Sequence, residues 1–159
     1  MVKEIKITQD RVTLVDDEDF DYLNQWKWHS SRHHRTWYAL RRSSTDGSLT
    51  CMHTLILQTP KGMCSDHING DGLDNRRCNL RICTYAENAH NRNKYVRQKA
   101  SIYKGVCWHN TMRKWMPSIT ICGKRIYLGF FESEVEAAKS YNEAAKKYYG
   151  EFAKLNEVD

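Results

Sequence analysis

Residues 66–93 carry polar side chains whose types and spacing suit phosphodiester hydrolysis. The segment opens with the adjacent pair Asp66 and His67, and Asn79 and Asn88 follow 12 and 21 residues beyond His67. An imidazole with an ordinary pKa near ~6.5 can take a proton from a water nucleophile. Carboxylate and amide oxygens are hard donors that suit Mg²⁺ or Mn²⁺. A packed core alone would not require this combination, so the segment points to function.

One divalent cation could neutralise the attacked phosphate and stabilise the leaving oxygen. Asp66 would supply one ligand and Asn88 a second from a helix, while His67 acts as the general base. Neighbouring residues on a regular strand point to opposite faces. Asp66 and His67 can therefore serve one site only if the strand is distorted where they lie.

The elements that must hold these residues are predicted to be a strand, a loop, a strand and a helix. Residues 65–67 form the first strand and residues 79–83 the second, with a glycine-containing loop between them. Thr84 is a natural N-cap with Glu87 three residues further on, which is a capping box. The helix is expected to run from there to about Asn93.

Residues 1–50 are interpreted as short strands with one small helix. The acidic residues 16–19 suit the first turn of that helix, and Asp46-Gly47 is a hairpin turn. Residues 52–57 should form a short helix or strand. The strands are expected at residues 5–7, 12–15, 26–28 and 37–40.

Residues 102–131 contain three strand candidates, and a helix follows them. Ser133 is the expected N-cap with Glu136 at the capping-box position, and apolar residues then recur every three or four positions until Gly150. The polar and basic residues 93–101 are interpreted as a linker. The three strands are expected at residues 103–109, 114–122 and 124–131.

The whole chain has a net charge of +6, and its positive charge is concentrated in the second half. Residues 75–131 contain twelve Lys and Arg against one acid, Glu87, whereas residues 1–50 contain eight of each sign. Such a concentration attracts phosphate backbones. Because Trp and Tyr are interleaved with the charges, a nucleic-acid surface is favoured over an ordinary solvated basic face.

Length and composition allow one or two small domains, since 159 residues with 40% apolar content can bury a core. No apolar stretch approaches the ~20 residues of a membrane span, and the N-terminus lacks a signal-peptide core. We therefore expect a soluble cytoplasmic protein with no membrane partner and reduced thiols. A zinc site at Cys64, Cys78 and Cys83 is a weaker alternative, because the spacing is unlike ordinary zinc knuckles.

The series DHINGDGLDNRRCNLR…ENAHNR resembles the HNH endonucleases, in particular the homing-type and phage-encoded branch, over about residues 52–93. The resemblance implies a ββα-metal fold that binds one Mg²⁺ or Mn²⁺. It implies that His67 is the general base and that Asp66 and Asn88 are metal ligands. It also implies that Asn79 constrains the loop and positions His67.

Other residues of this segment keep open roles. Asn75 is an alternative for the middle motif, and His90 and Asn91 are runners-up for the metal ligand on the helix. His53 stands where related sequences often place a histidine. Two roles for His53 are considered equally, packing in the core and contact with a phosphate.

The stretch from Tyr103 to Asn156 resembles the ethylene-response-factor (Apetala-two) DNA-binding domain. It contains, in order, Gly-Val-x-Trp, Lys-Trp, Gly-Lys, Leu-Gly-x-Phe and two Ala-Ala pairs. That family packs a three-stranded antiparallel sheet on one helix and lays the sheet in the DNA major groove. The first strand here departs from the Arg-rich plant pattern, so the plant target sequence is not carried over. The DNA contacts implied by the resemblance are Lys104, Trp108, Arg113, Trp115 and Arg125.

These observations together predict an α+β protein. An HNH nuclease domain with an N-terminal β-rich extension is expected over residues 1–95, a linker over 96–101 and an Apetala-two-type domain over 102–157. The expected function is metal-dependent nicking or cleavage of double-stranded DNA by a phage or mobile-element homing endonuclease in a bacterial host. A homodimer is expected if both strands are cut. A non-catalytic DNA-binding regulator and an RNA-directed protein are the alternatives.

Overall fold

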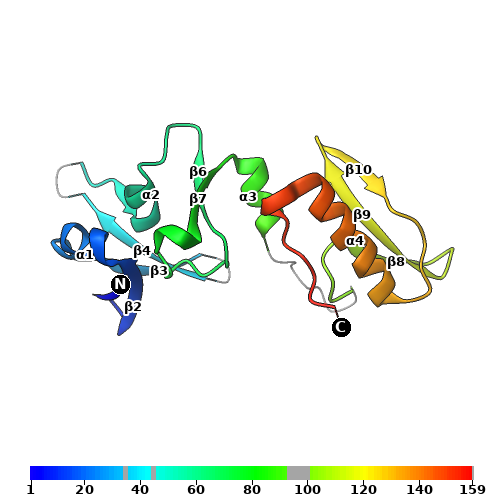
Figure 1. The fold of residues 1–159 in the computed structure, drawn as a ribbon, viewed down its shortest axis with the longest axis horizontal. Coiled ribbons are helices and arrows are strands. Elements are labelled where there is room, and N and C mark those ends of the chain that lie inside the picture. Colours follow the sequence, from blue (N-terminus) through cyan, green and yellow to red (C-terminus); the bar gives the residue numbers. More distant parts are fainter. Residues whose placement is uncertain (34–35, 44–45, 93–100, 159) are drawn as a thin grey trace. The chain divides into compact units, whose positions relative to one another are not determined.

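The structure, a computed structural model, describes residues 1–33, 36–43, 46–92 and 101–158. Most of the expected linker, residues 96–100, lies outside these ranges, as does Asn93 at the expected helix end. The chain divides into two compact units, Met1–Asn88 and Ala89–Asp159 (Figure 1). Within the described part of the chain, no helix has the length and apolarity needed to cross a membrane.

The first unit begins with an antiparallel hairpin of β1 (Val2–Ile7) and β2 (Arg11–Asp16). Gln9, in the turn that joins them, has a positive φ of 63°. Helix α1 (Asp17–Asn24) follows β2 directly, with three acids in its first turn. Negative charge there interacts favourably with the helix dipole. The strands predicted at residues 5–7 and 12–15 and the short helix with acidic residues in its first turn are thereby confirmed.

A three-stranded antiparallel sheet in the order β3-β4-β5 comes next. Its strands are β3 (His29–His33), β4 (Thr36–Arg42) and β5 (Leu49–Cys51). The strand predicted over residues 26–28 is wrong, because β3 begins only at His29. Trp28 is fully buried, and its Nε1 donates a hydrogen bond to the carbonyl oxygen of Leu23 at 2.9 Å. The indole therefore anchors the end of α1 instead of standing on a strand.

The segment with the candidate catalytic residues has the predicted order of strand, loop, strand and helix (Figure 1). Its elements are α2 (Met52–Leu57), β6 (Cys64–His67), a 3-10 turn (Arg77–Asn79), β7 (Leu80–Cys83) and α3 (Tyr85–Asn91). Asn79 lies in the 3-10 turn and not on the strand. The capping box is confirmed, since the Thr84 amide donates to a Glu87 carboxylate oxygen at 2.8 Å and the Glu87 amide to Thr84 Oγ1 at 3.2 Å.

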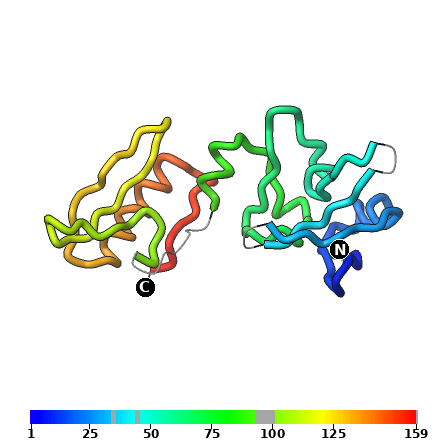
Figure 2. Tube along the Cα trace, turned by 180° about the vertical axis from the view of Figure 1, so that it is seen from behind, coloured from blue at the N-terminus to red at the C-terminus, as the bar shows by residue number. Residues whose placement is uncertain are grey.

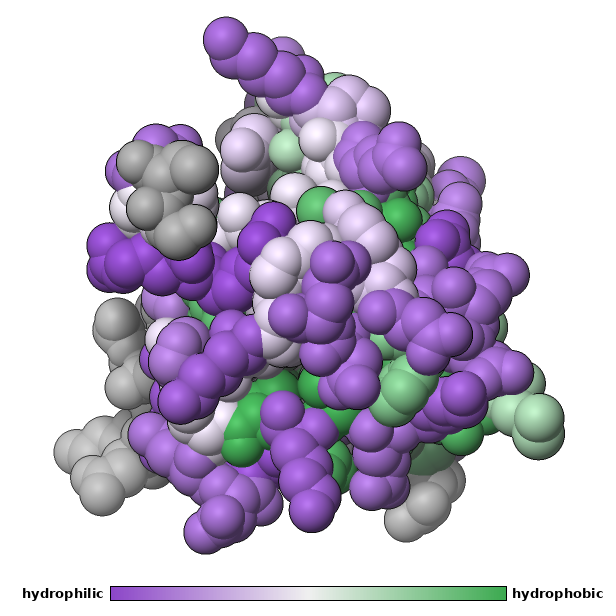
Figure 3. All heavy atoms as spheres, turned by 90° about the vertical axis from the view of Figure 1, so that its left-hand side faces the viewer, coloured by the Kyte–Doolittle hydropathy of each residue, from purple (hydrophilic) through white to green (hydrophobic). Residues whose placement is uncertain are grey.

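One apolar core connects the N-terminal hairpin to the elements around β6 and β7. It joins Val15 of β2 and Leu23 of α1 to Met52 of α2 and Leu80 of β7, all of them buried. The face of the molecule drawn in Figure 3 is mostly hydrophilic, with small apolar patches. The N-terminal extension thus shares its core with the candidate site.

The second unit is a three-stranded antiparallel sheet in the order β10-β9-β8, packed on helix α4 (Glu134–Tyr149) (Figure 2). Its strands are β8 (Val106–His109), β9 (Lys114–Ile121) and β10 (Lys124–Tyr127), and a 3-10 turn (Gly150–Phe152) ends α4. Gly105 has a positive φ of 76°, and a Cβ there would lie 2.1 Å from the Tyr141 ring, so only glycine fits. Small buried residues such as Ala138 let α4 approach the sheet closely.

Candidate functional site

His67 is the last residue of β6 and is almost fully buried. Its Nε2 lies 3.2 Å from Oδ1 of Asn75, in the loop between β6 and β7. Its ring packs edge-on against His53 of α2, with the centroids 4.8 Å apart, and near Tyr38 of β4 at 5.7 Å. The candidate base thus sits in an aromatic pocket with one amide contact.

Burial favours the neutral form of both imidazoles in this pocket, because it lowers the pKa of each. It lowers the pKa of His67, although the hydrogen bond to Asn75 works in the opposite direction. It lowers the pKa of His53 to about 3, and the neighbouring His67 adds to the effect. Within the described part of the chain, the buried Nδ1 of His53 has no hydrogen-bond partner. A neutral imidazole is the form that can accept a proton.

Asn79 makes the contacts of a residue that constrains the loop. Its Nδ2 donates to the carbonyl oxygen of Asp74 at 2.8 Å, and its Oδ1 accepts from the amide of Asn69 at 3.0 Å. Its carbonyl oxygen accepts from the amide of Ile68 at 2.9 Å. The side-chain contact with His67 comes instead from Asn75, which the sequence offered only as an alternative.

Asp66 forms a buried ion pair with Arg81, its register partner on β7. Nη2 and Nε of Arg81 lie 2.8 and 3.0 Å from Oδ2 of Asp66, and neither side chain exceeds 10% exposure. The β6–β7 ladder is regular through His67, so Asp66 and His67 point to opposite faces. The strand distortion that a shared face would need is therefore absent from β6.

Asn88 lies on the same side of the hairpin as Asp66. Its Nδ2 donates to Sγ of Cys64 at 3.6 Å, and Cys64 and Asp66 are two residues apart on β6 and so share a face. Sγ of Cys64 lies 3.5 Å from Sγ of its register partner Cys83. The structure thus brings Asp66 and Asn88 to one face and places His67 on the other.

The Asp66 face carries one carboxylate, paired with Arg81, and the amide side chain of Asn88. One carboxylate and one amide oxygen are ligands typical of Mg²⁺, which keeps several waters or phosphate oxygens in its remaining positions. Among the described residues, no three His, Cys, Asp or Glu side chains gather in a way that could hold a metal ion. The zinc alternative at Cys64, Cys78 and Cys83 consequently has no support.

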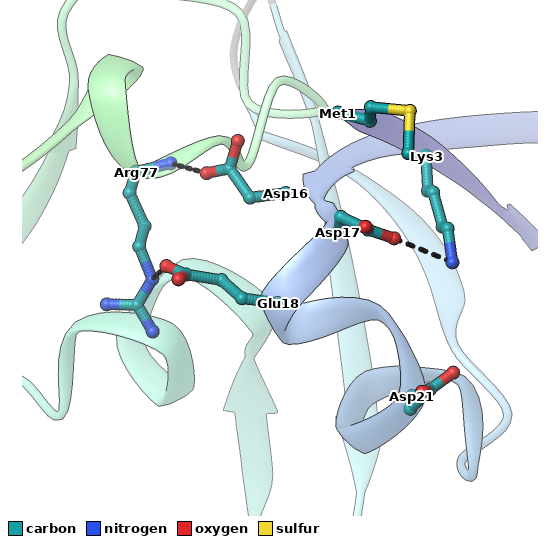
Figure 4. A pocket seen from close by; sticks show the side chains of 7 residues that line it. All are labelled: Met1, Lys3, Asp16, Asp17, Glu18, Asp21 and Arg77. Carbon is teal, nitrogen blue, oxygen red and sulfur yellow. Dashed lines mark hydrogen bonds and ion pairs between the residues drawn. The ribbon is translucent and has the colours of Figure 1, made fainter.

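Two ion-pair groups stabilise this loop, one within the loop and one with the N-terminal extension. Arg76 pairs with Asp74 at 2.7 Å and lowers the pKa of that carboxyl. Arg77 reaches the acids around α1, as Figure 4 shows: its amide donates to Asp16 at 2.7 Å, and its Nε lies 2.8 Å from Glu18. The N-terminal extension therefore contacts the loop that carries Asn75.

His90, one runner-up metal ligand, is engaged within the second unit. Its ring stacks on Tyr149 with centroids 3.7 Å apart. Nζ of Lys104 donates to the carbonyl oxygens of His90 and, at 2.8 Å, of Arg92. Burial lowers the pKa of Lys104 to about 8. Lys104 is therefore committed to backbone carbonyls, which distinguishes it from the other candidate DNA contacts.

The remaining candidate DNA contacts fall on both faces of the β8–β10 sheet. Trp108 and Trp115 are register partners, and alternation puts them on the same face as buried Val106, which α4 covers. Arg125 lies on the opposite, open face. Arg113, with a positive φ of 50°, lies between β8 and β9. Alternation also places Cys107, His109, Lys114, Met116, Ser118, Thr120 and Tyr127 on the open face.

Sequence reasoning missed several of these residues. Period-2 alternation from Val106 was the signal that could have identified Cys107 and His109 as open-face residues. No local signal pointed to Arg81 as the partner of Asp66.

Residues 58–90 match the model of the HNH endonuclease family. An uncharacterized HNH endonuclease of Acanthamoeba polyphaga mimivirus is 30% identical over 110 residues, which cover 68% of this chain and 56% of the viral protein. Together these two likenesses support a nuclease of the HNH class.

Plant transcription factors provide the second likeness. An AP2-like ethylene-responsive transcription factor of Arabidopsis thaliana is 40% identical over 62 residues, and an APETALA2-like protein of Oryza sativa is 38% identical over 60 residues. These matches cover 39% and 38% of this chain, and the chain spans only 13% and 14% of the plant proteins. No solved structure matches the chain.

Proposed function

We propose that this protein is a metal-dependent endonuclease that hydrolyses phosphodiester bonds in double-stranded DNA. The observation that carries the proposal is the buried, neutral His67 at the end of β6, inside the segment that matches the HNH endonucleases. In this proposal the imidazole of His67 takes a proton from the attacking water. The amide contact with Asn75 and the ring of His53 limit the orientations open to it.

Asp66 and Asn88 would hold one Mg²⁺ or Mn²⁺, which when bound would neutralise charge on the phosphate and the leaving oxygen. Their position on one face of the β6–β7 hairpin supports this pairing. His67 points to the other face, so the end of β6 would have to distort when the cation and DNA bind, bringing the imidazole to the same phosphate. Arg81 now neutralises the Asp66 carboxylate. The Arg81 guanidinium must therefore move away from the Asp66 carboxylate, at least in part, when Asp66 binds a cation.

Contacts with DNA would come in part from the open face of the β8–β10 sheet. Arg125 there can hold a phosphate or form two hydrogen bonds to a guanine. Residues 75–131 contain twelve Lys and Arg and one acid. This positive charge would attract the duplex over a distance. The likeness to plant DNA-binding factors supports this role for the second unit.

The biological setting that we propose is a homing endonuclease encoded by a phage or mobile element and acting in the cytoplasm of a bacterial host. The viral relative supports an origin in a mobile or viral genome. One catalytic hairpin per chain favours nicking by a monomer, and cutting of both strands would require a homodimer.

A plasmid-nicking assay tests the proposal. Supercoiled DNA should become nicked or linear with the full chain and Mg²⁺, and neither EDTA-treated protein nor His67→Ala should do this. His29→Ala is a matched control, because His29 is an exposed histidine at the start of β3. If the wild type binds DNA without any metal-dependent cutting, the regulator alternative replaces the nuclease. Preferential cutting of RNA over duplex DNA would also overturn the proposed substrate.

A further inference from the structure

A chain of hydrogen bonds leads from β2 to His67. Oγ1 of Thr13 donates to the carbonyl oxygen of Leu73 at 2.7 Å. Nδ2 of Asn75 donates to Oγ1 of Thr13 at 2.7 Å, and Oδ1 of Asn75 lies 3.2 Å from Nε2 of His67. Thr13 and Asn75 are 62 residues apart in sequence, and both have 0% exposure. Water therefore cannot replace these partners.

The direction of each bond in this chain is determined by its neighbour. The groups within reach of the Thr13 hydroxyl proton are the carbonyl oxygen of Leu73 and, at 3.9 Å, the sulfur of Met52, both of which can only accept. Thr13 Oγ1 must then accept from Asn75, so the amide nitrogen of Asn75 faces Thr13. The carbonyl oxygen of Gly72, 3.5 Å from the same nitrogen, favours that orientation too.

The amide oxygen of Asn75 is consequently turned toward His67. An amide oxygen accepts and cannot donate, so Nε2 of His67 must carry the proton in the neutral imidazole. The lone pair then resides on Nδ1. Which nitrogen is protonated decides which one can act as a base, because a neutral imidazole has one of each kind.

We propose that Thr13 and Asn75 are positioning residues that hold His67 as its Nε2–H tautomer and so make Nδ1 the proton acceptor. The inference rests on the proposed function of His67 as the general base. It gives the N-terminal hairpin a role in the reaction, since Thr13 belongs to β2 and touches no reacting atom.

Backbone hydrogen bonds hold the two positioning residues, Thr13 and Asn75, next to each other. The amide of Leu14 donates to the carbonyl oxygen of Leu73 at 2.9 Å, and the amide of Asn75 donates to that of Leu14 at 2.8 Å. Leu14 and Asp74 thus form a parallel bridge between β2 and the loop. With both backbones held, the Asn75 side chain has little freedom to swing away from His67.

Nitrogen-15 NMR of the imidazoles tests the tautomer directly and without any activity. In the wild type, His67 Nε2 should show the shift of a protonated nitrogen and Nδ1 that of a lone-pair nitrogen. Asn75→Ala should give a mixture of tautomers, whereas Asn75→Asp, which keeps an acceptor oxygen, should preserve the Nε2–H form. A wild-type Nδ1–H form, or no change in Asn75→Ala, would overturn the inference.

Cleavage rates test the relay at its far end. Thr13→Val keeps the shape but removes the acceptor, and it should slow DNA cleavage about 10-fold, while Thr13→Ser should stay within about threefold of the wild type. Asn75→Ala should slow cleavage about 100-fold, since a misplaced general base loses roughly that much. Thr8→Val is the control, because the Thr8 hydroxyl bonds to Ser30 and not to Asn75.

The two tests separate the inference from the proposed function. A wild type with the expected tautomer but no cleavage would refute the nuclease and leave the relay standing. Active wild type with unchanged rates in both Thr13 variants would refute the relay and leave the nuclease standing. If Thr13→Val does not fold, Thr13→Ser and the two Asn75 variants still test the inference. Loss of the Nε2–H form of His67 in Asn75→Asp would contradict it.

Discussion

On one face of the β6–β7 hairpin Asp66 pairs with Arg81, whereas on the other face His67 lies against His53 and Tyr38. The first face is charged and offers oxygen donors. The second is aromatic, and burial lowers the pKa of both of its imidazoles. A single strand of four residues thus separates the groups suited to bind a cation from the group suited to move a proton. Variants on the two faces should therefore fail in different ways.

The largest difference is expected between His67→Gln and Asp66→Asn. Losing the general base should lower the maximal cleavage rate about 10²–10⁴-fold without moving the Mg²⁺ concentration that gives half the maximal rate. Losing the carboxylate charge should raise that concentration. Cleavage measured over a Mg²⁺ titration distinguishes the two, and identical Mg²⁺ curves for both variants would contradict the division between the faces.

The next largest effect concerns Arg81→Gln. Removing one partner of a buried ion pair leaves the other charge uncompensated and typically destabilises by about 3–5 kcal/mol. A cation bound at Asp66 would supply the missing positive charge. Thermal unfolding should therefore show Mg²⁺ raising the Tm of Arg81→Gln more than that of the wild type. Equal shifts would argue against a cation site at Asp66.

On the aromatic face the expected effect is a dependence of stability on pH. Burial lowers the pKa of His53 to about 3, while the unfolded chain protonates this imidazole near ~6.5. Below that pH the unfolded state binds a proton that the folded state excludes, so the free energy of unfolding falls as pH decreases toward about 3. The slope per imidazole is at most about 1.4 kcal/mol per pH unit.

His53→Phe should therefore flatten the pH dependence of stability, as measured by urea unfolding at a series of pH values below ~6.5. The matched control is His29→Phe at an exposed position of β3. If both variants keep the wild-type slope, the buried imidazole of His53 does not resist protonation.

The smallest effect is expected in the second unit. Arg125→Ala on the open face should weaken DNA binding and reduce the salt dependence of affinity by about one phosphate contact. Lys104→Ala should change DNA affinity less, since its ammonium group is occupied by carbonyl oxygens. Filter binding at several salt concentrations compares them, and a larger loss for Lys104→Ala would reverse this assignment.

Local chemistry was enough to predict much of the fold. The capping box at Thr84 and the N-cap at Ser133 are formed by atoms within three residues of each other, so sequence specifies them directly. The strand expected at Trp26–Trp28 failed because Trp28 finds its partner on α1, a contact that depends on tertiary packing. Propensity cannot report such a contact.

The candidate site was predicted less completely, for the same physical reason. His67 and Asn79 were predicted from their spacing. The side-chain contacts of Asn79 lie within the loop between β6 and β7, whereas the ring of His67 also packs against His53 of α2 and Tyr38 of β4. The partner of Asn75 is Thr13, which the fold brings together from a distant strand. Strand register decides which residues lie on each face of the β8–β10 sheet. Trp108 was predicted as a DNA contact from the family resemblance, without regard to the alternation of side chains along the strand.

The parallel bridge between Leu14 and Asp74 has a consequence for what can be inherited or transplanted as a unit. The match to the HNH family model begins at residue 58, yet the Asn75 side chain that contacts His67 is held by the hydroxyl of Thr13. A fragment limited to the matched residues 58–90 would lack Thr13 and so lose the hydrogen bond that holds Asn75 next to His67. The smallest fragment that keeps the contacts of His67 intact therefore begins at the first hairpin.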